Sequence, residues 1–275
     1  MESINTNIYS LEELCYYLYH NLYLVDSSVI NENLCVWISE QLELPRLAAK
    51  IRPHLGKFAS AEDVLYPIFK EINYLTYEEL KALNLRLAKW DQEAPVLREK
   101  RKGDALVENR MYVNAIRVYQ KLLKRENLDQ AKQGLTMNIW HNLGCAYSYL
   151  FQMEKAMECF WEAFLTEGRE EELICYLLAY RSVKKPEEYQ KKLVELKVTE
   201  EVKEELKTDW MLFQREKKLP WASERQMKYW RSLPENITEA QAHESVLLVC
   251  VLRKKNCLTE NHLYATILLH GRVTT

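Results

Sequence analysis

The stretch MNIWHNLGCAYSYLFQMEKAMECFWEAFLT, residues 137–166, decides the fold of this chain. Two sets of residues recur in it at helical spacing, and each set lies on one helical face. The first set is Trp140, Leu143, Gly144 and Tyr147, and the second is Ala156, Phe160 and Ala163. Small residues suit places where two helices approach closely, and large ones fill the space between them. The stretch therefore predicts two packed helices joined by a short turn.

The spacing W-x2-L-G-x2-Y followed by A-x3-F resembles the tetratricopeptide repeat (TPR), a helix–turn–helix unit of about 34 residues. Trp, Tyr, Gly and Phe are uncommon, at roughly 1 to 7 % of residues each, so their coincidence at fixed offsets is a specific signal. The resemblance is strong over residues 137–168. It implies a stack of helix pairs whose inner face holds a protein or a peptide.

Weaker copies of the same unit flank the strong one. Within residues 98–123 the motif positions are held by Gly103, Ala115, Tyr119 and Leu122, whereas the Trp and Leu positions are not met. Gly103 precedes Gly144 by 41 residues (144 − 103). About seven extra residues therefore fall in the connection 126–136, because the unit is about 34 residues long. Residues 171–196 predict a third, divergent helix pair, as at least three stacked units are usually needed for stability.

Helix starts are indicated where Ser or Thr is followed three residues later by an acidic residue. These pairs are Ser10 with Glu13, Ser60 with Asp63, and Thr76 with Glu79. The apolar pattern continues the first helix through Leu22. Residues 37–51 are similar to a DNA-reading helix-turn-helix. However, residues 1–60 hold four Lys/Arg against seven Asp/Glu, and few side chains there could read bases. Two helices packed at an angle explain this segment equally well.

The break at residues 91–95 marks a border, because Pro95 suits the first turn of a new helix. We therefore expect an N-terminal helical region (1–94), TPR-like repeats (95–198) and a C-terminal helical region (199–275). The last region contains the apolar run VLLVCVL, residues 246–252, for which a buried helix is favoured and a buried strand remains open. The predicted fold class is all-α: a helical hairpin array, or TPR-like α-solenoid, with N- and C-terminal helical caps.

Composition excludes several classes of protein. A net charge of −2 gives no field that would hold nucleic acid or an anionic membrane. Seven cysteines, an odd number without C-x-x-C spacing, indicate free buried thiols in a reducing compartment. The N-terminus lacks the pattern of a signal peptide, and no apolar run is long enough to span a bilayer. We expect a cytoplasmic protein without membrane insertion.

The resemblance implies a peptide groove lined by the first helix of each repeat. In the strong unit it comprises Asn138, His141, Asn142, Cys145, Ser148 and Tyr149, and Lys100 and Asp104 extend it in the preceding unit. Some TPR proteins bind the C-terminal carboxylate of a chaperone through lysine, asparagine and arginine side chains. Lys100 and Asn142 match that clamp, whereas Asp104, Glu172 and Tyr176 depart from it. Two carboxylates would repel a bound carboxylate, so this ligand is not expected.

Signals for catalysis are thin. The six histidines show no H-E-x-x-H spacing, and no phosphate-binding, dinucleotide-binding or nucleophile-elbow motif is present. We expect no catalytic residue, no cofactor and no metal. A basic and aromatic group, Trp221, Arg225, Lys228, Tyr229, Trp230 and Arg231, suits either single-stranded nucleic acid or an amphipathic helix, and we favour the helix. The basic run Arg98, Lys100, Arg101 and Lys102 suits an acidic partner or, more simply, a solvated helix face.

The expected function is that of a non-catalytic adaptor or scaffold that binds a protein or peptide, without nucleic acid. A peptide-sensing regulator and a specialised chaperone of a secretion or signalling system are the alternatives. The apolar C-terminal helices fold back over the array or are covered by another chain, which leaves self-association open.

Overall fold

A computed structural model describes residues 6–55 and 62–215, and within them every regular element is a helix. The predicted all-α class is confirmed by helices that pack with their neighbours along the chain. The chain divides into two compact units, Met1–Asn114 and Ala115–Thr275. The helix start predicted at Ser60 and the elements predicted in residues 216–275 lie outside the described residues.

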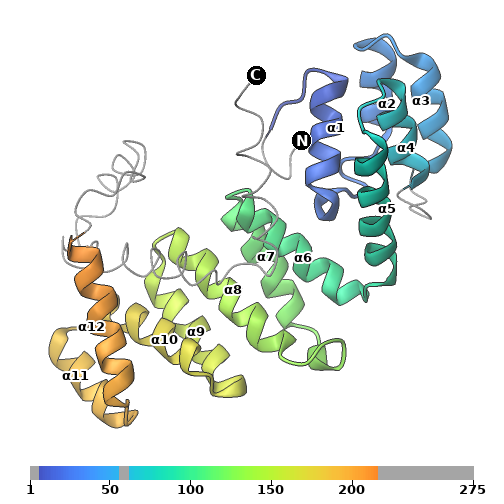
Figure 1. The fold of residues 1–275 in the computed structure, drawn as a ribbon. Coiled ribbons are helices and arrows are strands. Elements are labelled where there is room, and N and C mark those ends of the chain that lie inside the picture. Colours follow the sequence, from blue (N-terminus) through green and yellow to red (C-terminus); the bar gives the residue numbers. More distant parts are fainter. Residues whose placement is uncertain (1–5, 56–61, 216–275) are drawn as a thin grey trace. The chain divides into compact units, whose positions relative to one another are not determined.

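The first unit is built from short helices (Figure 1). They are α1 (Leu11–His20), η2 (Leu22–Leu24), α2 (Glu32–Glu40), α3 (Pro45–Ile51), η3 (Arg52–His54), α4 (Glu62–Glu71), α5 (Tyr77–Gln92) and α6 (Pro95–Glu108). Two predicted caps are confirmed. The side chain of Ser10 accepts from the backbone of Glu13, and Thr76 forms a complete capping box with Glu79. Pro95 occupies the first turn of α6, as expected for a residue without a backbone N–H.

A continuous apolar core holds this unit together. Leu14 and Leu18 of α1, Ile38 of α2, Leu47 of α3 and Ile68 of α4 are fully buried in it. The segment similar to a helix-turn-helix forms α2 and α3, which pack on each other, and α3 also packs on α4. Both helices therefore contribute their apolar faces to the core.

The predicted border at residue 94 falls in the turn between α5 and α6. The compact units divide later, inside α7 (Tyr112–Leu123), since α6 packs against η2 of the first unit. Two hydrogen bonds fasten α6 there: Lys102 donates to Asp26, and Asn109 donates to the side chain of Asn21.

The second unit continues with helix pairs. After α7 come η4 (Leu128–Gln130), α8 (Leu135–Tyr149), α9 (Met153–Glu167), α10 (Glu170–Val183), α11 (Pro186–Glu195) and α12 (Glu200–Arg215). Helix α9 packs against both α8 and α10, and α10 also contacts α11 and α12. The extra residues predicted at 126–136 form η4 and a turn in which Gly134 adopts φ +71°, a backbone conformation that favours glycine.

Gly144 marks the closest approach between α8 and α9. A Cβ atom at this position would lie 2.8 Å from Cε1 of Phe160, which is closer than real Cβ atoms come to their neighbours. Phe160, Ala156 and Ala163 are fully buried, and Leu143 and Tyr147 are nearly so. Trp140 is half-buried. The predicted pairing of a small residue with a large ring across two helices is confirmed.

The weaker copy is carried by α6 and α7. Its motif residues Ala115, Tyr119 and Leu122 on α7 are fully buried, and Gly103 is buried on α6. No helix among the described residues is long and apolar enough to cross a bilayer.

Candidate functional site

The α8 stripe is the part of the predicted groove that one helix carries by itself. We give this name to Asn138, Asn142, Cys145 and Tyr149, which follow one another at intervals of four, three and four residues. At 3.6 residues per turn these side chains lie on one face of α8. Lys100 and Asp104, the remaining part of the predicted groove, lie on α6 in the first unit.

The centre of the α8 stripe is closed. Asn142 is 4 % exposed and Cys145 is fully buried, whereas Asn138 and Tyr149 at the two ends are half-buried. Ser148, also expected in the groove, is fully buried and donates its hydroxyl to the carbonyl of Gly144. The inner face of a repeat array is ordinarily open to solvent. The four residues of the α8 stripe are therefore on one face, but only the two ends of that face reach the surface.

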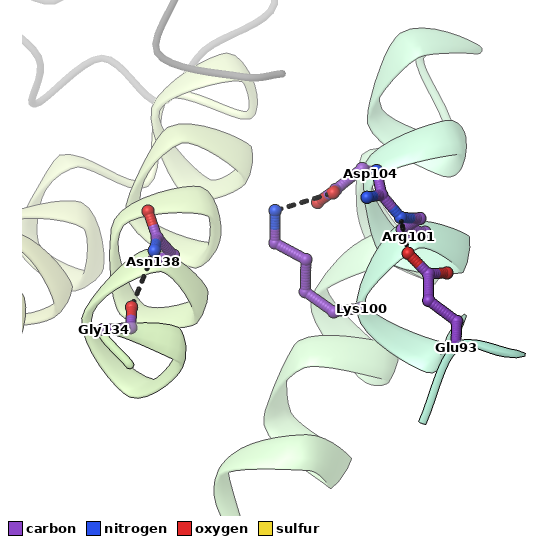
Figure 2. Close-up of polar contacts among 6 residues, drawn as sticks. All are labelled: Glu93, Lys100, Arg101, Asp104, Gly134 and Asn138. Carbon is purple, nitrogen blue, oxygen red and sulfur yellow. Dashed lines mark hydrogen bonds and ion pairs between the residues drawn. The ribbon is translucent and has the colours of Figure 1, made fainter. Parts of the chain in front are cut away.

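Asn138 is tied to its own helix. Its side-chain Nδ2 donates to the carbonyl oxygen of Gly134 at 2.7 Å (Figure 2). This bond fixes the amide over the first turn of α8, where Gly134 is the N-cap residue. This bond uses one of the two N–H donors of the amide. A primary amide has a second N–H donor and a carbonyl acceptor, which suit a peptide ligand.

A polar pair joins α8 to α10. Nδ1 of His141 lies 2.6 Å from Oε2 of Glu172, and both side chains are 7 % exposed. The ring of Phe160 meets the imidazole edge-on, with centroids 5.5 Å apart. Glu172 therefore contacts a histidine of the preceding helix pair. The pair was not found from the sequence, because 31 residues separate its members and no local pattern connects them.

Lys100 and Asp104 bind each other. Nζ of Lys100 lies 2.7 Å from Oδ2 of Asp104 one turn later on α6, with side chains 20 % and 9 % exposed (Figure 2). A carboxylate already offsets the charge of the lysine that matches the chaperone clamp. Glu172, at another position of the clamp, pairs with His141. Neither Lys100 nor Glu172 therefore offers a cation that could bind a C-terminal carboxylate.

The rest of the basic run is also engaged. Nε of Arg101 lies 2.5 Å from Oε1 of Glu93 (Figure 2), and Nζ of Lys102 lies 2.5 Å from Oδ2 of Asp26. The guanidinium of Arg98 stacks 4.7 Å from the centroid of the Trp90 ring. These cations fasten α6 within the first unit. The basic run therefore stabilises the packing of α6. This role favours the solvated helix face over a binding site for an acidic partner.

The Lys102–Asp26 pair predicts a pH-dependent contribution to stability. Burial raises the pKa of Asp26, but hydrogen bonds from Lys102 and Ser28 outweigh it and leave the pKa below its ordinary value of 3.8. Stability from such a carboxyl is present above the unfolded-state pKa and is lost as pH falls through the folded-state pKa. We expect Lys102→Met to lower the free energy of unfolding at pH 7 by less than about 1 kcal/mol, since the pair is partly exposed.

Urea unfolding at pH 7 and through the acid range measures this effect. The deficit of the Lys102→Met variant should shrink as the pH falls below 3.8, the ordinary pKa of aspartate. Lys50→Met, at an exposed position on α3, is the matched control and should show no such trend. A deficit of the same size at every pH would contradict the assignment.

The described residues hold no group of three or more potential metal ligands. Five cysteines in this part of the chain are free and buried, as predicted. Burial, with a smaller contribution from nearby glutamates, raises the pKa of Cys15 and of Cys159 to about 12. Both thiols are therefore poor nucleophiles near neutral pH.

Comparison with protein-family models, with curated proteins and with solved structures gave no match to this chain. The geometry of α8, α9 and α10 is consequently the ground on which a function can be proposed.

Proposed function

We propose that this protein is a non-catalytic adaptor or scaffold that binds a protein or peptide through the α8 stripe. The observation that carries the proposal is the placing of Asn138 and Tyr149, the half-buried ends of the α8 stripe, on one face of a helix whose middle is buried. Asparagine offers both donors and an acceptor, which match the N–H and C=O groups of a peptide backbone. Tyrosine adds an apolar ring with a polar tip.

The packing behind the stripe supports this proposal. Gly144 allows α9 to lie close behind α8, and the His141–Glu172 pair fixes α10 beside it. A binding surface gains affinity when its side chains are held in place before the ligand arrives. The same packing favours assignment of α8 and α9 to a TPR-like unit, with α10 and α11 as the following unit.

Selection from a displayed random-peptide library on the full chain tests the proposal. The affinity of a selected peptide would then be measured by fluorescence anisotropy for the wild type and for an Asn138→Ala/Tyr149→Ala variant. These two residues are half-buried ends of the stripe, so the variant should remain folded. We expect at least a tenfold loss of affinity, about 1.4 kcal/mol or more.

Glu154→Ala/Glu158→Ala is the matched control, because both glutamates are exposed on α9. It should bind the peptide like the wild type, and circular dichroism should give the same helix content for all three proteins. Unchanged binding by the Asn138→Ala/Tyr149→Ala variant would place the ligand elsewhere. Failure of the wild type to enrich any peptide would speak against a peptide-binding function.

A further inference from the structure

Helix α1 of the first unit exposes aromatic and acidic side chains together. Its apolar side is buried in the core of that unit, and its opposite side is exposed. We call this opposite side the α1 face and define it by five exposed residues: Tyr9, Glu12, Glu13, Tyr16 and His20. The four that belong to the helix lie within about 100° around its axis, since successive residues are about 100° apart. Two large rings, 74 % and 55 % exposed for Tyr9 and Tyr16, therefore lie beside two carboxylates.

The ring of Tyr16 is held in place although it is exposed. Its centroid lies 4.3 Å from that of His20, and His20 meets the ring of Tyr19 edge-on at 5.1 Å. Tyr19 in turn contacts Phe69, a residue of the core. A ring that is fixed before binding loses little conformational entropy on binding, and tyrosine is enriched among the residues that contribute most to interfaces. The α1 face is therefore ordered in the way that a binding surface requires.

The charge of this part of the chain has one sign. Residues 1–45 contain seven Asp/Glu and no Lys or Arg. Asp26 is offset by Lys102 of α6. In contrast, no lysine or arginine among residues 6–55 and 62–215 forms an ion pair with Glu12 or Glu13. The α1 face therefore attracts a cationic partner and repels an anionic one.

We propose that the α1 face binds an arginine-containing segment of a partner protein. Glu12 and Tyr16 are four residues apart on α1, a spacing that places their Cβ atoms about 5–6 Å from each other. A guanidinium that stacks on the ring of Tyr16 can therefore donate hydrogen bonds to the carboxylate of Glu12 at the same time. The chain already contains the first of these contacts, because the guanidinium of Arg86 lies 5.2 Å from the ring centroid of Tyr19.

This inference adds a second binding surface to the one proposed above. It does not rest on the α8 stripe, because α1 and α8 belong to different compact units. The two surfaces also differ in chemistry, since the α8 stripe offers an amide and a phenol, whereas the α1 face offers carboxylates and stacked rings. An adaptor needs two such surfaces in order to hold two different partners at once.

Fluorescence anisotropy with defined peptides tests the inference on the full chain. The probe is a short fluorescein-labelled peptide of alternating arginine and alanine, and matched peptides carry lysine, glutamine or glutamate in place of arginine. We expect the arginine peptide to bind more tightly than the lysine peptide, because a guanidinium stacks on tyrosine and binds a carboxylate through two hydrogen bonds. The glutamine and glutamate peptides should not bind. Affinity for the arginine peptide should fall as salt is added, since salt screens exposed charges.

The test variant is Glu12→Gln/Tyr16→Ala, and Tyr77→Ala/Glu78→Gln is the matched control. The control removes one exposed tyrosine and one exposed glutamate from the first turn of α5 in the same unit, so both variants have the same net charge. We expect the test variant to lose at least about tenfold in affinity for the arginine peptide and the control to lose less than about twofold. Circular dichroism should give the same helix content for all three proteins, because every substituted side chain is exposed.

Several results would overturn the inference. They include a wild type that does not bind the arginine peptide, a test variant that binds it equally well, and equal losses in the test and control variants. The Asn138→Ala/Tyr149→Ala variant should bind this peptide like the wild type, and a loss there would place the peptide on the α8 stripe instead. A dimer seen by analytical ultracentrifugation in the wild type and absent in the test variant would assign the α1 face to a second copy of the chain. None of these results except a loss in the Asn138→Ala/Tyr149→Ala variant bears on the α8 stripe.

Discussion

Glu172→Ala is expected to lower the free energy of unfolding by about 2–4 kcal/mol. The change removes the carboxylate that lies 2.6 Å from Nδ1 of His141 at a site where both side chains are 7 % exposed. Water cannot readily replace that carboxylate without opening the space between α8 and α10. Urea unfolding of the full chain at pH 7, followed by circular dichroism, measures the change.

Glu171→Ala provides the matched control, because it removes an exposed carboxylate from the same turn of α10. Its effect should stay within about 0.5 kcal/mol, as for most surface substitutions. Equal effects of the two substitutions would show that the His141–Glu172 contact contributes nothing to stability. The first turn of α10 is acidic, and both variants alter the helix dipole similarly, so the difference between them isolates the buried pair.

A double substitution measures the energy of the contact between His141 and Glu172 separately from the effect of losing either side chain alone. Replacing both members of a buried polar pair by apolar residues of similar size is often nearly neutral, whereas removing one member is not. We therefore expect His141→Leu/Glu172→Leu to be more stable than the sum of the single changes predicts, by at least about 1 kcal/mol. The measured coupling energy is the part of the stability that belongs to the contact between α8 and α10.

The sequence predicted those features that depend on residues close together in the chain. The approach of Gly144 to Phe160 follows from helical spacing within one helix pair, and the caps at Ser10 and Thr76 follow from residues three positions apart. The spacing of Lys100 and Asp104, one turn apart on a helix, was itself a signal of mutual pairing. This spacing was a better guide to the role of Lys100 than its match to the chaperone clamp.

Features that depend on distant contacts were not predictable in this way. The His141–Glu172 pair arises only when two helix pairs stack, and the closed centre of the α8 stripe depends on what lies over it. The first helix was expected to continue through Leu22 but ends at His20. There Asn21 caps the helix, as its backbone N–H and its side-chain Nδ2 both donate to the carbonyl of Tyr17. The chain then continues as η2, whose residue Leu22 still reaches the core.

Phe160→Ala is expected to have the largest effect on stability, about 3–5 kcal/mol, because it leaves a cavity in a fully buried part of the α8–α9 interface. The ring of Phe160 lies against Gly144 and meets the imidazole of His141, so its loss loosens both helices. Thermal and urea unfolding of the full chain measure the effect. Phe164→Ala, at a half-buried position one turn later on α9, is the control and should cost clearly less.

Gly144→Ala is informative in two backgrounds. In the wild type its Cβ would lie 2.8 Å from the Phe160 ring, and we expect the overpacking to cost about 1–3 kcal/mol. In the Phe160→Ala background that obstacle is gone, and alanine is the better helix former by about 1 kcal/mol. The same substitution should then be neutral or stabilising. This change of sign is specific to a small residue packed under a ring. If Gly144→Ala destabilises both backgrounds equally, Phe160 is not what requires glycine on α8.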